Sequence, residues 1–186
     1  MPHRHALFAG THVFQSEDIA AAEALLERLK ARRATLVTAE SCTGGLIAAL
    51  LTEVPGSSAV VDCGLVTYSN GAKCDLLGVP ATLIGRYGAV SAEVAVAMTG
   101  GALRASTANI AVAVTGVAGP EGGTADKPVG LVHLAAQMRD HGAITKVLTL
   151  GDIGRRAIRL ATVREAVALL NQALDEAAGS AAMGAP

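Results

Sequence analysis

The amino-acid sequence predicts one three-layer α/β/α domain with a mixed sheet, and three observations predict this fold class. Helical and strand-like segments alternate up to residue 115, a hairpin of two strands follows them, and 186 residues suit a single domain. The alternating part favours parallel strands, whereas the hairpin adds an antiparallel pair. The sheet is therefore expected to be mixed.

The elements follow from periodicity and from helix-start and turn residues. Ser16 is a common type of helix cap, Glu17 and Asp18 suit the positive end of a helix, and apolar residues then recur every three or four positions. The apolar run at 109–115 is typical of a strand covered on both faces. In order, we expect a helix at 16–33, a strand at 34–38, a helix at 43–53, a strand at 59–68, short helices ending near 78 and starting at 80, a helix at 91–105, strands at 109–115, 129–138 and 144–150, and a helix at 155–177.

The chain shows one domain region between two terminal segments. Residues 1–15 lack clear periodicity and are expected to form a flexible N-terminal arm. Residues 16–177 are expected to form the domain, and the small residues of 178–186 a flexible tail. No internal repeat or interdomain linker is visible.

Composition excludes several classes of partner. Hydrophobic residues make up 51% of the chain, but no uninterrupted run is long enough to span a bilayer, so we expect no membrane partner. Aromatic residues are only 2%, Trp is absent and the formal net charge is −1, which argues against a nucleic-acid partner. The apolar-rich composition favours a homo-oligomer.

The three cysteines indicate a reducing compartment. Cys42, Cys63 and Cys74 form no C-x-x-C motif and are odd in number, which disfavours a disulfide framework or a zinc ribbon. The N-terminus also lacks the apolar run of a secretory signal. We therefore expect a cytoplasmic protein.

Ser41 is a candidate nucleophile because it lies where a strand passes into a helix. The following residues, Cys42 to Gly45, are expected to present free backbone N–H groups that can hold an oxyanion or a phosphate. The alternative is that Ser41 or Thr43 only caps the helix, and from this segment alone that interpretation is favoured. Cys42 is a rival nucleophile, although no nearby histidine would raise its thiolate fraction.

Lys73 is the best candidate for the base that a serine nucleophile requires. None of the five histidines is placed like a catalytic partner. Lys73 follows a predicted strand and Tyr68, and burial there would lower its pKa enough for it to accept the serine proton. Tyr68 could hydrogen-bond either partner or the substrate. The alternative is a solvated lysine at a helix start.

A glycine-rich loop and two arginines are candidates for binding an anion. Thr115 and Gly116 begin a loop after the buried strand, and it matches neither the P-loop nor the dinucleotide fingerprint. A plain turn remains the simpler interpretation. Arg155 and Arg156 open the last helix after Asp152, and a guanidinium suits phosphate geometry.

Several segments taken in register resemble the CinA carboxy-terminal domain family, the nicotinamide-nucleotide amidohydrolases. The matching segments are Thr38-Ala39-Glu40-Ser41-Cys42-Thr43-Gly44-Gly45, Pro55-Gly56-Ser57-Ser58, Val66-Thr67-Tyr68-Ser69-Asn70 with Lys73, Leu77-Gly78-Val79, Tyr87-Gly88-Ala89-Val90-Ser91, Thr115-Gly116-Val117-Ala118-Gly119-Pro120, Lys127-Pro128-Val129-Gly130 and Gly151-Asp152.

The resemblance implies hydrolysis of nicotinamide mononucleotide to nicotinate mononucleotide and ammonia, without a cofactor or metal. It implies Ser41 as nucleophile, Lys73 as base and Tyr68 as an assisting group. The N–H groups of Cys42, Thr43, Gly44 and Gly45 would stabilise the oxyanion, and Thr115, Gly116 and Arg155 would bind the ribose-phosphate end. Many relatives carry an arginine directly after Gly-Asp, whereas Ile153-Gly154 intervene here, which leaves Arg155 and Arg156 both open for the phosphate.

Two alternatives to this function remain. One is a serine amidase that uses the same residues on another small amide. The other is a non-catalytic domain that binds a nucleotide or a partner, because a fold can keep a pocket without its chemistry.

Overall fold

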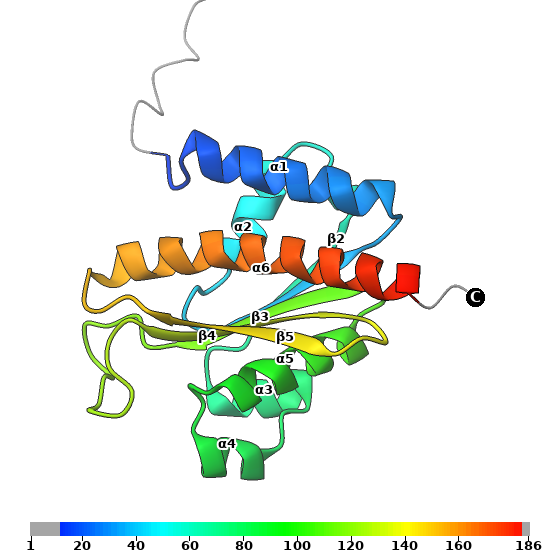
Figure 1. Cartoon of the computed structure of the whole chain (residues 1–186). Coiled ribbons are helices and arrows are strands. Elements are labelled where there is room, and N and C mark those ends of the chain that lie inside the picture. The colour runs from blue at the N-terminus through cyan, green and yellow to red at the C-terminus, as the bar shows by residue number, and fades with distance from the viewer. Residues whose placement is uncertain (1–11, 184–186) are drawn as a thin grey trace, which may run out of the picture.

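The computed structural model describes residues 12–183, and the side chains among them up to residue 179. It confirms an α/β fold of three layers around one mixed sheet of five strands, in the order β2-β1-β3-β4-β5 (Figure 1). The strands are β1 (Leu36–Glu40), β2 (Val61–Val66), β3 (Ile110–Gly116), β4 (Leu131–Met138) and β5 (Ala143–Thr149). The helices are α1 (Ser16–Ala31), α2 (Leu46–Glu53), the 3-10 turn η1 (Ser57–Ala59), α3 (Asn70–Leu77), α4 (Ala81–Tyr87), α5 (Ala92–Ala105) and α6 (Arg155–Met183).

The sheet is parallel on one side and antiparallel on the other. Strand β1 pairs in parallel with β2 and β3, while β3, β4 and β5 pair antiparallel. Every residue of β1 is buried, as is nearly all of β3, because both faces of these central strands are covered. The carboxyl ends of β1, β2 and β3 therefore meet at one edge of the sheet, where open α/β sheets place ligands.

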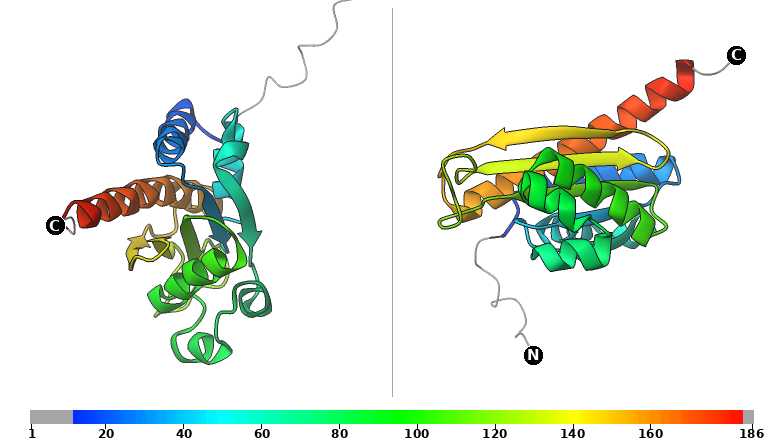
Figure 2. Two further views of the ribbon diagram at one scale, coloured as in Figure 1. Left: turned by 90° about the vertical axis from the view of Figure 1, so that its right-hand side faces the viewer. Right: turned by 90° about the horizontal axis from the view of Figure 1, so that it is seen from below.

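Helices cover both faces of the sheet and enclose two separate apolar cores. Helices α1, α2 and α6 lie on one face, and α3, α4 and α5 lie on the other, as Figure 1 and the view from below in Figure 2 make clear. Leu25, Leu26 and Leu29 of α1 are fully buried in the first core. Each contributes about 1.5–3 kcal/mol of transfer free energy. The rigid sheet between the two cores holds its carboxyl edge in place.

The starts of two helices differ from the predicted ones. Gln15 rather than Ser16 is the residue that precedes α1, and its N–H donates to Asp18. Helix α2 starts at Leu46 rather than Thr43, because Gly44 and Gly45 have φ of +59° and +94°, which a right-handed helix does not allow.

The terminal segments also differ from the predicted ranges. Residues 1–11 of the expected arm lie outside the described residues, and within the remainder Phe14 is buried in the first core. At the other end, α6 continues to Met183, past the expected end at 177. Alanine, which is frequent there, is the best helix former, so the small residues extend the helix.

Candidate active site

Ser41 is the first residue after β1 at the carboxyl edge of the sheet. Its N–H donates to the carbonyl of Val114 at 3.1 Å, so it is still held against β3 before the chain turns. Its side chain is nearly buried, at 8% exposure, and lies among the residues that line a pocket. The predicted placement of Ser41 at a strand end is confirmed by this geometry.

The turn after Ser41 has only two N–H groups available. The carboxylate of Glu40 accepts from the N–H groups of Gly45, Ile47 and Ala48 at 2.9–3.1 Å. The positive end of α2, where we expected an external anion, is therefore occupied by a carboxylate of the chain itself.

The N–H of Gly44 is also used, because it donates to the Ser41 carbonyl at 3.0 Å. The predicted oxyanion donors at Gly44 and Gly45 are thus committed elsewhere. The N–H groups of Cys42 and Thr43 donate to no oxygen in the described part of the chain, and they remain as candidates.

Lys73 lies against Ser41, as the nucleophile–base hypothesis requires. Its Nζ is 3.1 Å from Ser41 Oγ and donates to the Thr67 carbonyl at 2.8 Å. The side chain is 1% exposed, which rules out the solvated lysine. Burial lowers the pKa of Lys73 from its ordinary value, and the nearby thiols of Cys42 and Cys74 oppose this shift more weakly.

The local sequence explains how Lys73 comes to this position. The Ser69 hydroxyl accepts from the N–H of Ala72 at 3.0 Å, so α3 begins directly after the short link from β2. Lys73 therefore lies in the first turn of α3, beside the carboxyl ends of β2 and β1.

A pocket of about 280 Å³ opens beside Ser41 and Lys73. It is lined by Ser41, Cys42, Tyr68, Asn70, Lys73, Ala89, Val90, Thr115, Gly116, Val117, Ala118, Gly119, Glu121, Gly122 and Arg155. Of the predicted binding residues, Cys42, Thr115, Gly116 and Arg155 line it, whereas Thr43, Gly44 and Gly45 do not. At Gly116 a Cβ would lie 2.7 Å from Val132, so only glycine fits there.

Arg155 forms the rim of this pocket together with Tyr68. Its guanidinium donates to the Tyr68 hydroxyl at 2.7 Å and to the Gly119 carbonyl at 2.9 Å. Tyr68 thus bonds the arginine rather than Ser41 or Lys73. Arg156 is exposed and outside the lining, so Arg155 is the arginine that faces the pocket.

Cys42 is poorly suited to be the nucleophile. Burial raises the pKa of its thiol to about 11, and the carboxylate of Glu40 adds to this effect. A thiol with this pKa stays protonated at neutral pH, and the thiolate is the reactive form. Ser41 therefore remains the better nucleophile.

Two residues that shape the site were given no role from the sequence. Glu40 is fully buried and holds α2, and an acidic residue inside an apolar strand is a signal that could have been used, because a buried carboxylate needs partners. Arg159 donates to the carbonyls of Cys42 and Thr43. Its place four residues after Arg155 puts both arginines on one face of α6.

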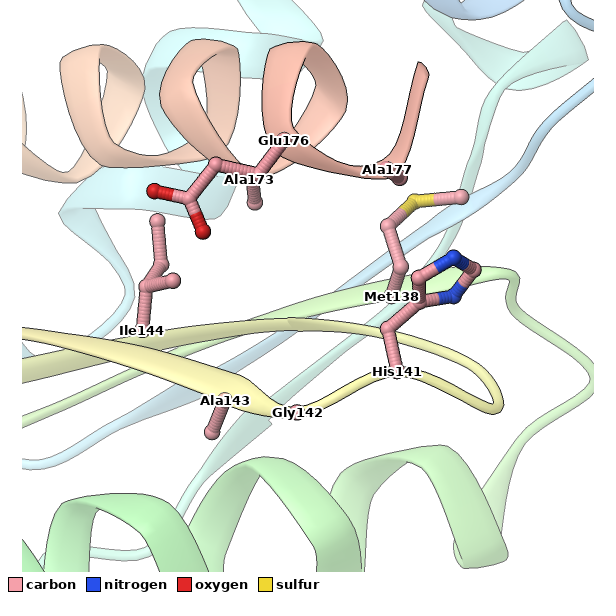
Figure 3. A pocket seen from close by; sticks show the side chains of 8 residues that line it. All are labelled: Met138, His141, Gly142, Ala143, Ile144, Ala173, Glu176 and Ala177. Atoms are coloured by element: carbon pink, nitrogen blue, oxygen red, sulfur yellow. The ribbon is translucent and has the colours of Figure 1, made fainter. Parts of the chain in front are cut away.

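A second pocket lies at the opposite edge of the sheet, between the β4–β5 turn and the end of α6 (Figure 3). It is lined by Met138, His141, Gly142, Ala143, Ile144, Ala173, Glu176 and Ala177. It contains no serine, cysteine or lysine. The candidate nucleophile Ser41 and the candidate base Lys73 both line the other pocket.

Two features are absent from the part of the chain that the structure describes. No group of three or more His, Cys, Asp or Glu side chains is arranged to hold a metal ion. Among the same residues, no helix is both long and apolar enough to cross a membrane.

Comparison with known proteins gives consistent matches to one family. Residues 18–174 match the family model described as the CinA C-terminal domain. The chain is 50% identical over 153 residues to a CinA-like protein of Geotalea daltonii, a match that covers 82% of this chain and 37% of that protein. The chain thus spans well under half the length of such curated relatives.

Solved structures agree with this match over nearly their whole length. The competence/damage inducible protein CihA of Agrobacterium tumefaciens has a TM-score of 0.85 at 51% identity, covering 89% of this chain and 99% of that one. The competence damage-inducible protein A of Klebsiella pneumoniae has a TM-score of 0.81 at 36% identity, covering 85% and 97%.

Proposed function

This chain belongs to the CinA C-terminal domain family, and we propose that it hydrolyses the carboxamide of nicotinamide mononucleotide to nicotinate mononucleotide and ammonia. The observation that carries the proposal is the buried Nζ of Lys73, 3.1 Å from Ser41 Oγ, in a pocket with an arginine at its rim. A buried lysine beside a serine suits attack on an amide, and an arginine suits a phosphate.

The first half of the proposed reaction is acyl transfer to Ser41. Neutral Lys73 accepts the Ser41 hydroxyl proton while Oγ attacks the carboxamide carbon. The N–H groups of Cys42 and Thr43 stabilise the oxyanion of the tetrahedral intermediate. The C–N bond then breaks, Lys73 returns the proton to the leaving nitrogen, and ammonia departs.

The second half releases nicotinate mononucleotide. Water attacks the Ser41 ester and gives its proton to Lys73. The ester C–O bond breaks, Ser41 Oγ recovers the proton from Lys73, and the acid product leaves. The same lysine serves both halves, and polarisation comes from backbone donors.

The nucleotide end of the substrate is assigned to the rim. Arg155 uses two of its nitrogens on Tyr68 and Gly119, and a guanidinium has five N–H donors, so others remain for a phosphate. In this arrangement Tyr68 assists by holding Arg155 in place. Thr115 donates its hydroxyl to the Ala89 carbonyl at 2.8 Å and keeps lone pairs for a ribose hydroxyl.

The direct test is ammonia release from a panel of amides by the purified chain. We expect turnover of nicotinamide mononucleotide, weaker turnover of nicotinamide riboside, and none of free nicotinamide, because only the first reaches Arg155. Turnover of an unrelated small amide in preference to all three would instead support the alternative, a serine amidase that acts on another small amide. Binding of the nucleotide without any turnover would contradict the proposal and favour a non-catalytic domain.

Replacing Arg155 with Met should weaken substrate binding more than chemistry. Loss of a charge-assisted pair with phosphate costs about 1.5–3 kcal/mol, so KM for the mononucleotide should rise about 10–100-fold while kcat changes less. Turnover of the riboside should change little. The neighbouring Arg156→Met variant is the matched control, and an equal rise in its KM would contradict the assignment of Arg155.

A further inference from the structure

Arg159 contacts the turn after Ser41 without lining the pocket. Its Nε donates to the Cys42 carbonyl at 3.1 Å, and Nη2 donates to the Thr43 carbonyl at 2.6 Å. It packs so closely that a Cβ on Gly44 would lie 3.3 Å from Nη2. Hydrogen bonds from a charged donor are stronger than neutral ones, so these two contacts hold the turn firmly.

These contacts decide where the free amides point. Within a trans peptide unit the C=O and N–H groups point in opposite directions, and the cis bond described in this chain is at Gly119–Pro120. Because the Cys42 carbonyl points to Arg159, the N–H of Thr43 points away from it. Because the Ser41 carbonyl accepts from Gly44, the N–H of Cys42 points away from Gly44.

Both amides lie beside the thiol of Cys42. They are close enough to the sulfur of Cys42 to favour its thiolate, and Cys42 lines the pocket with Ser41. A guanidinium on the Cys42 carbonyl also polarises that peptide unit, which strengthens the N–H of Thr43 as a donor.

Glu40 holds the other end of the same turn. Its fully buried carboxylate accepts hydrogen bonds from the N–H groups of Gly45, Ile47 and Ala48. Arg159 donates hydrogen bonds to two carbonyls of the turn. The segment between them is thus held by an anion on one end and a cation on the other. Such preorganised donors cost no reorganisation when charge develops.

We propose that Arg159 is a positioning residue that orients the N–H groups of Cys42 and Thr43 as the oxyanion hole for attack by Ser41. The inference rests on the proposed function only in that Ser41 is the nucleophile. It does not depend on which amide is the substrate.

The test is the reaction of Ser41 with an alkyl fluorophosphonate, compared between Arg159→Met and Arg156→Met. In this reaction Ser41 Oγ forms a bond to phosphorus, the P–F bond breaks, fluoride leaves, and Lys73 takes the serine proton. The phosphoryl oxygen requires the same donors as an oxyanion. We expect Arg159→Met to slow labelling about 10–100-fold. This is less than the roughly 10²–10³-fold cost of removing an oxyanion-hole donor, because here the donors lose their orientation and are not removed. Arg156→Met should label like the wild type.

Two further measurements separate positioning from loss of fold. Millimolar guanidinium should accelerate labelling of Arg159→Ala, whereas the same concentration of tetramethylammonium should not, because only guanidinium can donate to the two carbonyls. With nicotinamide mononucleotide, Arg159→Met should lower kcat and leave KM nearly unchanged. Thermal unfolding of each variant tests whether it is folded, so that the labelling rates of folded proteins are compared.

The outcomes distinguish this inference from the proposed substrate. A wild type that labels, an Arg159→Met variant that labels slowly, and no ammonia from the mononucleotide would reject the substrate and leave the inference standing. Equal labelling of Arg159→Met and the wild type would overturn the inference. So would a folded Arg159→Ala variant that guanidinium does not rescue, or a wild-type Ser41 inert to the probe.

Discussion

The Ser41→Ala variant is expected to lose ammonia release from nicotinamide mononucleotide by on the order of 10⁵-fold, because it lacks the hydroxyl that we propose forms the acyl intermediate. Cys42 cannot replace it, since burial raises the pKa of its thiol to about 11. The measurement is single-turnover ammonia release, with the apparent Kd for the nucleotide determined separately by calorimetry.

The fold of this variant should be unaffected. The side chain of Ser41 contacts Lys73 through its hydroxyl, and the backbone bond to Val114 does not involve the side chain. Ser57→Ala is the matched control, because Ser57 has the same 8% exposure and lies outside the pocket lining. Near-native turnover by Ser41→Ala would show that the nucleophile lies elsewhere.

The Lys73→Met variant is expected to lose about 10²–10⁴-fold in kcat, the usual contribution of a positioned general base. Burial lowers the pKa of Lys73 below 10.5, so the wild-type rate should rise with pH and level off below the pH at which an exposed lysine titrates. The variant should lack this rise. An unchanged pH profile in Lys73→Met would exclude Lys73 as the base.

The lowered pKa of Lys73 also makes the free energy of unfolding depend on pH. The folded pKa of Lys73 is lowered, so between that pKa and 10.5 the unfolded chain binds more protons than the folded one. The free energy of unfolding of the wild type therefore rises with pH in this range. Lys73→Met lacks this contribution, so the Tm of the wild type should gain on the Tm of Lys73→Met as the pH rises towards 10.5. Lys30→Met, which removes a partly exposed lysine that pairs with Glu27, is the matched control for loss of a lysine.

The fold class could be predicted because its signals are local. The apolar run of β3, the helical spacing of α1 and the turn between β4 and β5 depend on neighbours within a few residues. The boundaries were less predictable. At Gly44 and Gly45 the left-handed backbone delays the start of the expected helix to Leu46, and Arg159 of the distant helix α6 contacts this turn through the Thr43 carbonyl.

The candidate site was predictable in its residue types and only partly in its contacts. Ser41, Tyr68 and Lys73 stood out together through the family resemblance. Tyr68 was expected near the reacting groups, yet its hydroxyl bonds Arg155, which lies 87 residues further along the chain. Two residues this far apart in the chain leave no periodic pattern in the sequence that would reveal their contact.

By itself the sequence determined the fold class, the strand-end position of Ser41 and the family match of its motifs, since these depend on residue type and short-range spacing. Only the tertiary structure decided that Lys73 is buried against Ser41 and that the free amides are those of Cys42 and Thr43. The physical reason is that desolvation and hydrogen-bond direction depend on what packs around a group. Here the surrounding groups come from α3 and α6, far from Ser41 in the chain. Ser41 is thus a residue that the sequence could point to, and the packing of these two helices brings Lys73 against it and Arg159 against the turn that follows it.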